Sequence, residues 1–384
     1  MDGQKGDLAG VTVVTLEHAA AAPYLSRTLA DAGARVIKVE HPEGDFSRNY
    51  DDLVKGQSSY FLWLNRGKES ICLNLEDQSD CEIMWRMLDD ADIFIQNLAP
   101  GGIERFGFTV PDLQRRNPRL ITCWISGYGN FGPMKDARAY DLLIQGECGL
   151  ASITGHGNAP VRVGIPIADL STGMTGSIAV FQALYHRERS GKGRHIEMSM
   201  YGTMADLMNV PYMQYAYSGE YPQRMGLQHP TIAPYGAYAC ARGLVLLIAI
   251  QTDREWQNFC IEVLQKPELM EDARFAHNQS RANSREALEA RIVETFLGLE
   301  RDEVIKRLEK AKIAYGRVNS LSDLADHPQN RFCDVETPNG PVRLFAPSAI
   351  FDGQLDQLGA VPSQDEHGAQ LRREFGPDTE KSAP

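Results

Sequence analysis

Apolar, β-branched segments alternate with a helical segment at the N-terminus, and this alternation constrains the fold most. Residues 11–16 (Val-Thr-Val-Val-Thr-Leu) and 35–40 (Arg-Val-Ile-Lys-Val-Glu) have the composition of buried strands, and residues 24–32 between them have helical spacing. Pro23 suits the first turn of that helix and Gly33 its end. Strands that alternate with helices across short connections predict a parallel sheet.

The alternation continues to about residue 217, so further parallel strands are expected. The beginning resembles a dinucleotide-binding fold, but alanines 19–22 stand where a G-x-G-x-x-G fingerprint would be. Alanines let a backbone approach a ligand almost as closely as glycines do, and close helix–strand packing explains them equally well. The expected strands are 71–75, 92–96, 120–125 and 194–200, and the expected helices are 80–89, 110–116, 142–150, 177–185 (continuing to about 188) and 202–217.

The pattern changes near residue 225. After a connection that contains Pro and Gly, residues 237–240 and 244–250 predict a hairpin. We therefore predict a small α+β domain at 225–325, and a large α/β domain from residues 1–224 and 326–384. Further elements are helices at 255–264, 285–297 and 301–311 and a strand at 342–345.

Composition and charge exclude several classes of protein. The chain of 384 residues carries a net charge of −12 and contains no run of five basic residues, so a nucleic-acid partner is not expected. Its seven cysteines are dispersed, without Cys-x-x-Cys or zinc spacing, which favours reduced thiols and no metal site. The polar N-terminus lacks the pattern of a signal peptide, and no 18-residue apolar stretch predicts a membrane span. The expected location is the cytoplasm.

Asp169 is the strongest catalytic candidate. An apolar segment ends at this carboxylate, and Ser171, Thr172, Gly173 and Gly176 follow before the predicted helix. An Asp at the entry to a helix commonly caps it, because its oxygens accept from free N–H groups. Alternatively, the carboxylate is a nucleophile that attacks an acyl group and carries it as an anhydride.

The ordered set of loops resembles the class III CoA-transferase family of the CaiB/BaiF type, the formyl-CoA transferase and carnitine CoA-transferase group. The likeness extends from Leu8 to about Gly376. The pieces are Ala-Ala-Pro23, Asp31 to Glu40 with Gly44-Asp45, Asn65-Arg-Gly-Lys68-Glu-Ser, Asn97-Leu-Ala-Pro-Gly, Arg105-Phe-Gly, Ser126-Gly-Tyr-Gly, Arg138-Ala-Tyr140-Asp141, Asp169-Leu-Ser-Thr-Gly-Met and His186 to Arg194.

This resemblance implies a Rossmann-like large domain built from both chain ends, with the small domain inserted. It also implies a homodimer of two interlocked rings. CoA enters only as part of the acyl-CoA substrate, so no further cofactor and no metal is expected.

The resemblance also implies a reaction. The Asp169 carboxylate attacks an acyl-CoA thioester and expels CoA thiolate, which leaves a mixed anhydride. The thiolate then attacks the aspartyl carbonyl, which releases the first acid and leaves an aspartyl-CoA thioester. A second carboxylic acid takes over CoA through a second anhydride. Backbone N–H groups at the helix start are expected to stabilise the oxyanions.

Positions that contact CoA in the family are transferred residue by residue. Arg105 and Arg138 are expected to meet CoA phosphates with bidentate geometry, and the Asn97 turn to border the adenine. Arg138 could instead pair with an acid. The full set of expected CoA contacts is Ala20, Ala21, His41, Leu73, Asn74, Leu75, Glu76, Asn97, Leu98, Ala99, Arg105, Arg138, Ala139, Tyr140 and Asp141.

Departures from the formyl-CoA branch point to other substrates. Ala20 replaces a polar residue, and a glycine-rich lid is missing, with residues 229–235 in the corresponding region. We expect succinyl-CoA as donor and itaconate, mesaconate, citramalate or malate as acceptor, or intramolecular transfer within one such acid. The candidates for binding the distal carboxylate are Arg48, Arg66 and Arg162.

Other functions remain as alternatives. An acyl-CoA racemase of the same fold needs a histidine where this chain has Tyr140. A non-catalytic CoA-binding protein and a dehydrogenase are less favoured, because the Asp169 segment is intact and the glycine fingerprint is absent. Arg66 and Lys68 could form a phosphate clamp, although a solvated turn is favoured.

Overall fold

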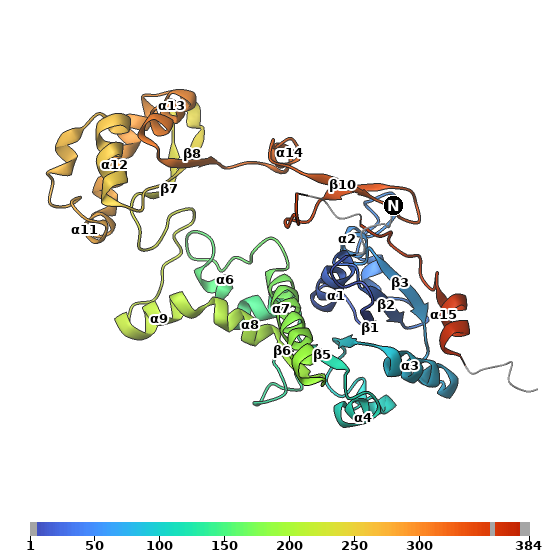
Figure 1. The fold of residues 1–384 in the computed structure, drawn as a ribbon. Helices are drawn as coiled ribbons and strands as arrows, with labels where there is room; N and C mark the ends of the chain where they lie inside the picture. Colours follow the sequence, from blue (N-terminus) through green and yellow to red (C-terminus); the bar gives the residue numbers. More distant parts are fainter. Residues whose placement is uncertain (1–5, 354–357, 377–384) are drawn as a thin grey trace, which may run out of the picture. The chain divides into compact units, whose positions relative to one another are not determined.

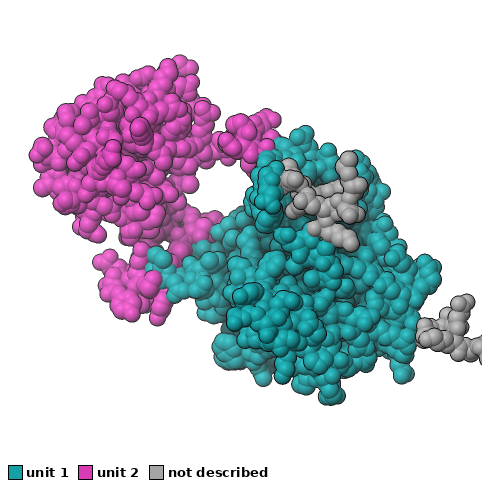
Figure 2. Space-filling view, viewed as in Figure 1, with its two compact units in different colours: residues 1–150, 163–210, 331–384 teal, residues 151–162, 211–330 magenta. Residues whose placement is uncertain are grey.

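The computed structural model describes residues 6–353 and 358–376, which form two compact units (Figure 2). Unit 1 contains residues 1–150, 163–210 and 331–384, and unit 2 contains residues 151–162 and 211–330. The predicted domain boundaries stay a prediction. The predicted large domain also includes residues 1–5, 354–357 and 377–384, which lie outside the described residues.

A six-stranded sheet with parallel neighbours forms the centre of unit 1 and confirms the predicted parallel α/β sheet (Figure 1). Its order is β3-β2-β1-β4-β5-β6, so the order of connection reverses between β1 and β4. Open α/β sheets bind ligands beyond the carboxyl ends of their strands at such a reversal. The strands are β1 (Thr12–Leu16), β2 (Arg35–Glu40), β3 (Lys68–Cys72), β4 (Ile93–Gln96), β5 (Ile121–Ser126) and β6 (His195–Ser199).

Both faces of this sheet are covered by helices. Successive strand residues point to opposite faces, so Val13 and Val14 belong to two different cores. Helices α1 (Ala21–Asp31) and α7 (Ile167–Ser190) cover the face of Val13. The other face is covered by α3 (Gln78–Asp90), α4 (Val110–Arg116) and α15 (Gly368–Phe375).

Small residues allow α7 to pack closely against α1. A Cβ at Gly173 would lie 2.7 Å from the carbonyl oxygen of Ala21, and one at Gly176 would lie 2.7 Å from Leu25. The helix expected at 177–185 therefore begins ten residues earlier, at Ile167, because these glycines serve helix packing and do not form a loop.

The clearest further differences from the predicted bounds concern β3 and two helical segments. Strand β3 lies at 68–72 and not at 71–75, since the charged side chains at its start are paired within the fold. Gly149 takes a positive φ of 84°, which divides the segment 142–150 into α5 (Asp141–Glu147) and α6 (Leu150–Ile153). The segment 202–217 forms two helices, α8 (Met200–Leu207) and α9 (Asn209–Ser218).

The C-terminal segment covers the edge strand β3. The Asp365 carboxylate accepts from the Cys72 N–H at 2.7 Å, and the His367 N–H donates to the Ser70 carbonyl at 3.0 Å. Residues from the two ends of the chain thus form one unit, and the exposed strand edge is covered. The segment also contains the antiparallel pair β10 (Phe332–Val335) and β11 (Val342–Phe345), of which only the second was predicted.

Unit 2 has a core of its own around Trp256, Phe259 and Phe296. Its sheet is antiparallel, and the pairing of β7 with β8 confirms the predicted hairpin. No helix within the described residues is long and apolar enough to cross a membrane. The elements are β7 (Tyr235–Ala239), β8 (Val245–Ala249), α10 (Asp253–Asn258), α11 (Asn278–Asn283), α12 (Arg285–Leu297), α13 (Arg301–Ala311), β9 (Ala314–Arg317) and α14 (Leu321–Ala325).

Candidate active site

Asp169 lies in the first turn of α7, three residues after the cap position. Pro166 occupies the N-cap, so the interpretation of Asp169 as the cap is wrong. The capping carboxylate is Asp141, whose Oδ1 accepts from the N–H of Ala168 at 2.8 Å and of Asp169 at 3.4 Å. The Asp169 carboxylate therefore does not accept hydrogen bonds from the N–H groups at the start of α7.

Asp141 connects the beginning of α5 to that of α7. Its Oδ2 accepts from Gln145 Nε2 at 2.7 Å, and Gln145 Oε1 accepts from the Val163 N–H at 2.8 Å. The contacts of Asp141 with Ala168 and Asp169 use N–H groups that were expected to bind an oxyanion. The first-turn N–H of Ala168, in particular, already has a carboxylate acceptor in this structure.

Two acidic side chains, Asp141 and Asp169, lie close together here. Within residues 6–353 and 358–376, no hydrogen bond or ion pair reaches the Asp169 carboxylate. Burial and, as the smaller cause, the neighbouring charge of Asp141 together raise the pKa of Asp169 to about 7. A carboxylate poorly compensated by its surroundings is a stronger nucleophile than an exposed one once it is deprotonated.

A row of aromatic side chains lies near this carboxylate. His18 packs on Phe46 with ring centroids 5.4 Å apart, Phe46 on Tyr50 at 5.7 Å, and Tyr50 on Tyr60 at 5.8 Å. Burial raises the pKa of Tyr50 to about 12, and the charges of Asp45 and Asp169 contribute to the rise. Tyr50 is thus a neutral phenol within electrostatic reach of Asp169. Sequence analysis missed it, and its position on the loop after β2 was the only available signal.

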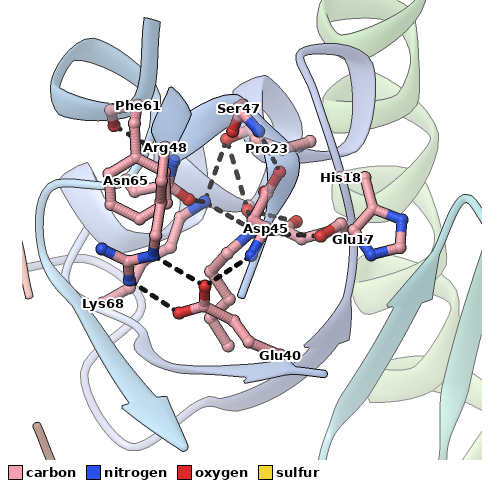
Figure 3. A network of polar contacts seen from close by, with 12 residues as sticks. Glu17, His18, Pro23, Glu40, Asp45, Ser47, Arg48, Phe61, Asn65 and Lys68 are labelled. Atoms are coloured by element: carbon pink, nitrogen blue, oxygen red, sulfur yellow. Dashed lines mark hydrogen bonds and ion pairs between the residues drawn. The ribbon is translucent and has the colours of Figure 1, made fainter. Parts of the chain in front are cut away.

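A network of buried charges includes Glu17, Asp45 and Lys68 (Figure 3). Glu17 accepts from Lys68 Nζ at 2.7 Å and from Ser26 Oγ at 2.7 Å, and Lys38 Nζ contacts Asp45 at 2.9 Å. Glu17 and Lys38 are fully buried. Although burial alone would raise it, Lys68 and Lys38 hold the pKa of Glu17 below its usual value. Each charge here has a partner of opposite sign, in contrast to Asp169.

Two arginines predicted to bind substrate are also paired with carboxylates. Arg48 forms an ion pair with Glu40 at 2.7 Å, and Arg66, 1% exposed, pairs with Asp31 at 2.7 Å. Both guanidinium groups are already paired, so the structure contradicts their assignment to a distal carboxylate. Lys68 is buried as well, which excludes both the phosphate clamp and the solvated turn. Arg162 is exposed and stays a candidate.

The predicted CoA-binding residues lie just beyond the carboxyl ends of β1 to β5, all in unit 1 (Figure 1). The structure thus brings them to one edge of the sheet. Ala20 and Ala21 are buried at the start of α1, and His41 is exposed after β2. The others are Leu73 to Glu76 after β3, Asn97 to Ala99 after β4, Arg105 in the 3₁₀ turn Glu104–Phe106, and Arg138 to Asp141, the last of which is the first residue of α5.

The reversal point of the sheet has a defined geometry. The side chain of Asn97 accepts from the His18 N–H at 2.8 Å and donates to the His18 carbonyl at 2.9 Å, which joins the ends of β1 and β4. Ala19 has a φ of 60°, uncommon for a residue with a side chain. A cavity of about 300 Å³ opens beside this point, and its wall includes Leu98, Trp124 and Lys135.

Two predicted cations remain accessible. Arg105 is exposed, and its guanidinium lies 4.4 Å from the ring centroid of Phe106. Arg138 is exposed and forms no ion pair within the part of the chain that the structure describes, so the pairing with an acid considered from the sequence is not found. Among the described residues, no group of three His, Cys, Asp or Glu side chains could hold a metal ion.

The open parallel sheet is typical of nucleotide-binding α/β folds, and the expected ligand contacts lie at its reversal point, where such folds bind their ligands. Comparison with known proteins identifies the family. The model of CoA-transferase family III matches residues 8–367, so the chain belongs to this family and is an enzyme of the transferase class.

Curated relatives and a solved structure agree with this assignment. The chain is 36% identical to an acetyl-CoA:oxalate CoA-transferase of Acetobacter aceti, covering 97% of this chain and 96% of that protein. It is 32% identical to a succinate–glutarate CoA-transferase of Agrobacterium fabrum (98% and 97% covered) and 31% identical to a succinyl-CoA:mesaconate CoA-transferase of Haloarcula marismortui (97% and 98%). A CaiB/BaiF family protein from Brucella suis matches with a TM-score of 0.81 and 35% identity, covering 97% and 100%. The activity supported for this chain is therefore transfer of CoA between acids.

Proposed function

We propose that this enzyme transfers CoA from succinyl-CoA to a C4–C5 dicarboxylic acid such as mesaconate, itaconate, citramalate or malate. The observation that carries the proposal is the uncompensated Asp169 carboxylate at the carboxyl edge of the sheet. The three relatives described above are named for oxalate, glutarate or mesaconate, and each of these is a dicarboxylate. Intramolecular CoA transfer within one such acid uses the same chemistry and is the alternative outcome.

Each step of the proposed reaction exchanges one acyl bond for another of similar energy. An Asp169 oxygen forms a bond to the acyl carbon, the C–S bond breaks, and CoA thiolate leaves. The thiolate attacks the aspartyl carbonyl, which releases succinate and leaves an aspartyl thioester. The acceptor carboxylate displaces the thiolate, and the thiolate attacks the acceptor's acyl carbon, which regenerates Asp169. No other reactant is needed.

Phenol groups are better placed than arginines to recognise the acids. Tyr50 is neutral at physiological pH and near Asp169, and Tyr140 directly precedes the residue that caps α7. A phenol O–H can donate to a carboxylate or to a developing oxyanion. Tyr140 also replaces the second base that a racemase would need, which argues against that alternative.

The predicted CoA contacts are proposed to bind the donor along the edge of the sheet. Arg105 and Arg138 carry the accessible positive charges for phosphates, and the cavity next to Leu98 suits an apolar or aromatic group. Asp141 is proposed as a positioning residue in place of a CoA contact, because its carboxylate holds the start of α7. The cytoplasmic location stays a prediction.

A second copy of the chain is proposed as the partner. Met174, Ile178, Phe181 and Tyr185 form one exposed apolar stripe on α7, at helical spacing, and they are between 40% and 67% exposed. Burial of this stripe against another copy would remove an apolar surface of a kind that isolated proteins rarely expose. A monomer in light scattering at assay concentrations would contradict this part.

The substrate proposal is tested with a panel of free acids. The enzyme is incubated with succinyl-CoA or acetyl-CoA and each acid, and the new acyl-CoA is identified by mass spectrometry. We expect CoA on C4–C5 dicarboxylates and little on monocarboxylates of the same length. Transfer to monocarboxylates alone would refute the substrate class, and exchange of an α-proton for deuterium without CoA transfer would indicate a racemase.

A further inference from the structure

Buried ion pairs hold the inner side of the loop that carries Tyr50. We define the Tyr50 loop as residues 44–50, which follow β2 and include the 3₁₀ turn Phe46–Asn49. Two of its side chains, Asp45 and Arg48, point into the protein and pair with residues of β2. The aromatic side chains of Phe46 and Tyr50 are about half exposed. The loop thus has a charged, buried side and an aromatic, accessible side.

Asp45 is held by several contacts at once. Its Oδ2 lies 2.9 Å from Lys38 Nζ, its Oδ1 accepts from the Ser47 N–H at 2.9 Å, and its own N–H donates to Glu40 Oε2 at 3.1 Å. The second of these contacts caps the 3₁₀ turn. Asp45 is 1% exposed and Lys38 is fully buried, so neither can touch a substrate.

Lys38 links this loop to the turn after β1. The same ammonium that binds Asp45 donates to the Glu17 carbonyl at 3.1 Å, one residue before His18. His18 in turn packs on Phe46 of the Tyr50 loop. One buried cation therefore joins the turn after β1 to the Tyr50 loop, and Figure 3 shows Asp45, Glu17 and His18 close together.

We propose that the Lys38–Asp45 ion pair is a positioning device for acyl transfer: it holds the Tyr50 loop against the turn after β1, so that Tyr50 is placed beside the reacting Asp169 carboxylate. This inference rests on the proposed function. Lys38 and Asp45 act through Tyr50, because both are shielded from the site. Loss of the pair lets the loop shift, and a shift of about 1 Å in a positioned group costs up to ~100-fold in rate.

The test is a double-mutant cycle with Asp45→Asn and Tyr50→Phe, in the full-length enzyme with succinyl-CoA and its best acceptor acid. Each single variant should lower kcat by about 10- to 100-fold. KM for the CoA donor should change by less than about threefold, because all the proposed CoA contacts except His41 lie on other loops. In the Tyr50→Phe background, Asp45→Asn should have little further effect, since the phenol it positions is gone.

A matched control removes another ion pair that involves β2. Glu69 on β3 pairs with Arg35 on β2 at 2.9 Å, distant in sequence from the Tyr50 loop. Glu69→Gln should keep kcat within about twofold, whatever its effect on the melting temperature. If Asp45→Asn does not fold, Asp45→Glu replaces it, because this variant keeps the charge but displaces it by one methylene.

The outcomes separate this inference from the proposed function. A wild-type enzyme without CoA transfer, or transfer that persists in Asp169→Ala, would refute the proposed function. If wild type is active and Asp169→Ala is not, the inference is overturned by a folded Asp45 variant with normal kcat. Effects of Asp45→Asn and Tyr50→Phe that multiply independently, or a change in KM alone, would also overturn it.

Discussion

Two groups of partly or fully buried carboxylates in unit 1 differ in one respect. At the ends of β1 and β2, Glu17 and Asp45 each contact a lysine within 2.9 Å. At the start of α7, Asp169 has no hydrogen-bond partner for its carboxylate among the described residues, and its neighbour is another acid. The first group is electrically balanced, and the second is not.

This difference indicates a structural role for the paired carboxylates and a reactive role for Asp169. In the paired group, lysines keep the pKa of Glu17 below its usual value and lower that of Asp45 to about 2, in each case against the effect of burial. In the unpaired group, burial and Asp141 raise the pKa of Asp169 to about 7. Paired charges hold segments together, whereas an uncompensated carboxylate is available to react.

The largest effect is expected from removal of the unpaired carboxylate. Asp169→Ala should reduce CoA transfer by ~10³-fold or more, because the nucleophile that carries both intermediates is absent. The assay follows acyl-CoA products by mass spectrometry. Asp112→Asn is the control, since Asp112 is also an acid in the first turn of a helix, α4, and should leave the rate unchanged. A rate loss of similar size in both variants would contradict the comparison.

Removal of Glu17 from the balanced group should affect stability more than chemistry. Glu17→Gln leaves Lys68 buried without its carboxylate and should lower the free energy of unfolding by roughly 3–5 kcal/mol. Denaturant unfolding measures this loss. The double variant Glu17→Leu/Lys68→Met should lose much less, because it removes both charges. A double variant as unstable as the single one would show that the pair is not a balanced unit.

The pH dependence of the rate should follow the ionisation of the Asp169 carboxylate. Asp169 must be deprotonated to attack, so kcat/KM should rise with pH and reach half its maximum near pH 7. Asp141→Asn removes a negative neighbour and should move the midpoint to lower pH, although part of the shift should persist because burial is the larger cause. A midpoint near pH 4 in the wild type would contradict the assigned environment.

The smallest expected effect is that of Asp169 ionisation on the stability of the folded chain. The pKa of Asp169 is higher in the folded chain than in the unfolded chain, so the folded state binds more protons between about pH 4 and 7 and loses stability as pH rises. Asp169→Asn cannot ionise and should raise the melting temperature by a few degrees at pH 8, with no gain at pH 4. An equal change at both pH values would exclude ionisation as the cause.

Much of the architecture could be predicted because it depends on local patterns. Strands such as 35–40 and 342–345 were placed at their observed bounds, since short apolar or alternating segments between turns are unambiguous. The start of α7 was not, because Gly173 and Gly176 suggest a loop until α1 is known to pack on them. That contact joins residues distant in sequence.

The site was predictable only in part for the same reason. Asp169 could be singled out from its segment, whereas the expected CoA-binding positions came from the family resemblance and stay a prediction. The sequence could not show that Asp141 caps α7, that Arg48 and Arg66 are paired, or that Tyr50 lies near Asp169. Each of these depends on which distant side chain lies opposite, and a single sequence does not contain that information.

The central claim, that Asp169 carries the transferred group, is tested most directly by trapping the intermediate. Enzyme incubated with succinyl-CoA, without an acceptor acid, is treated with hydroxylamine, and its peptides are analysed by mass spectrometry. The account predicts a hydroxamate on the Asp169 side chain that depends on succinyl-CoA. A hydroxamate on another residue, or an unlabelled Asp169 in enzyme that transfers CoA under the same conditions, would contradict it.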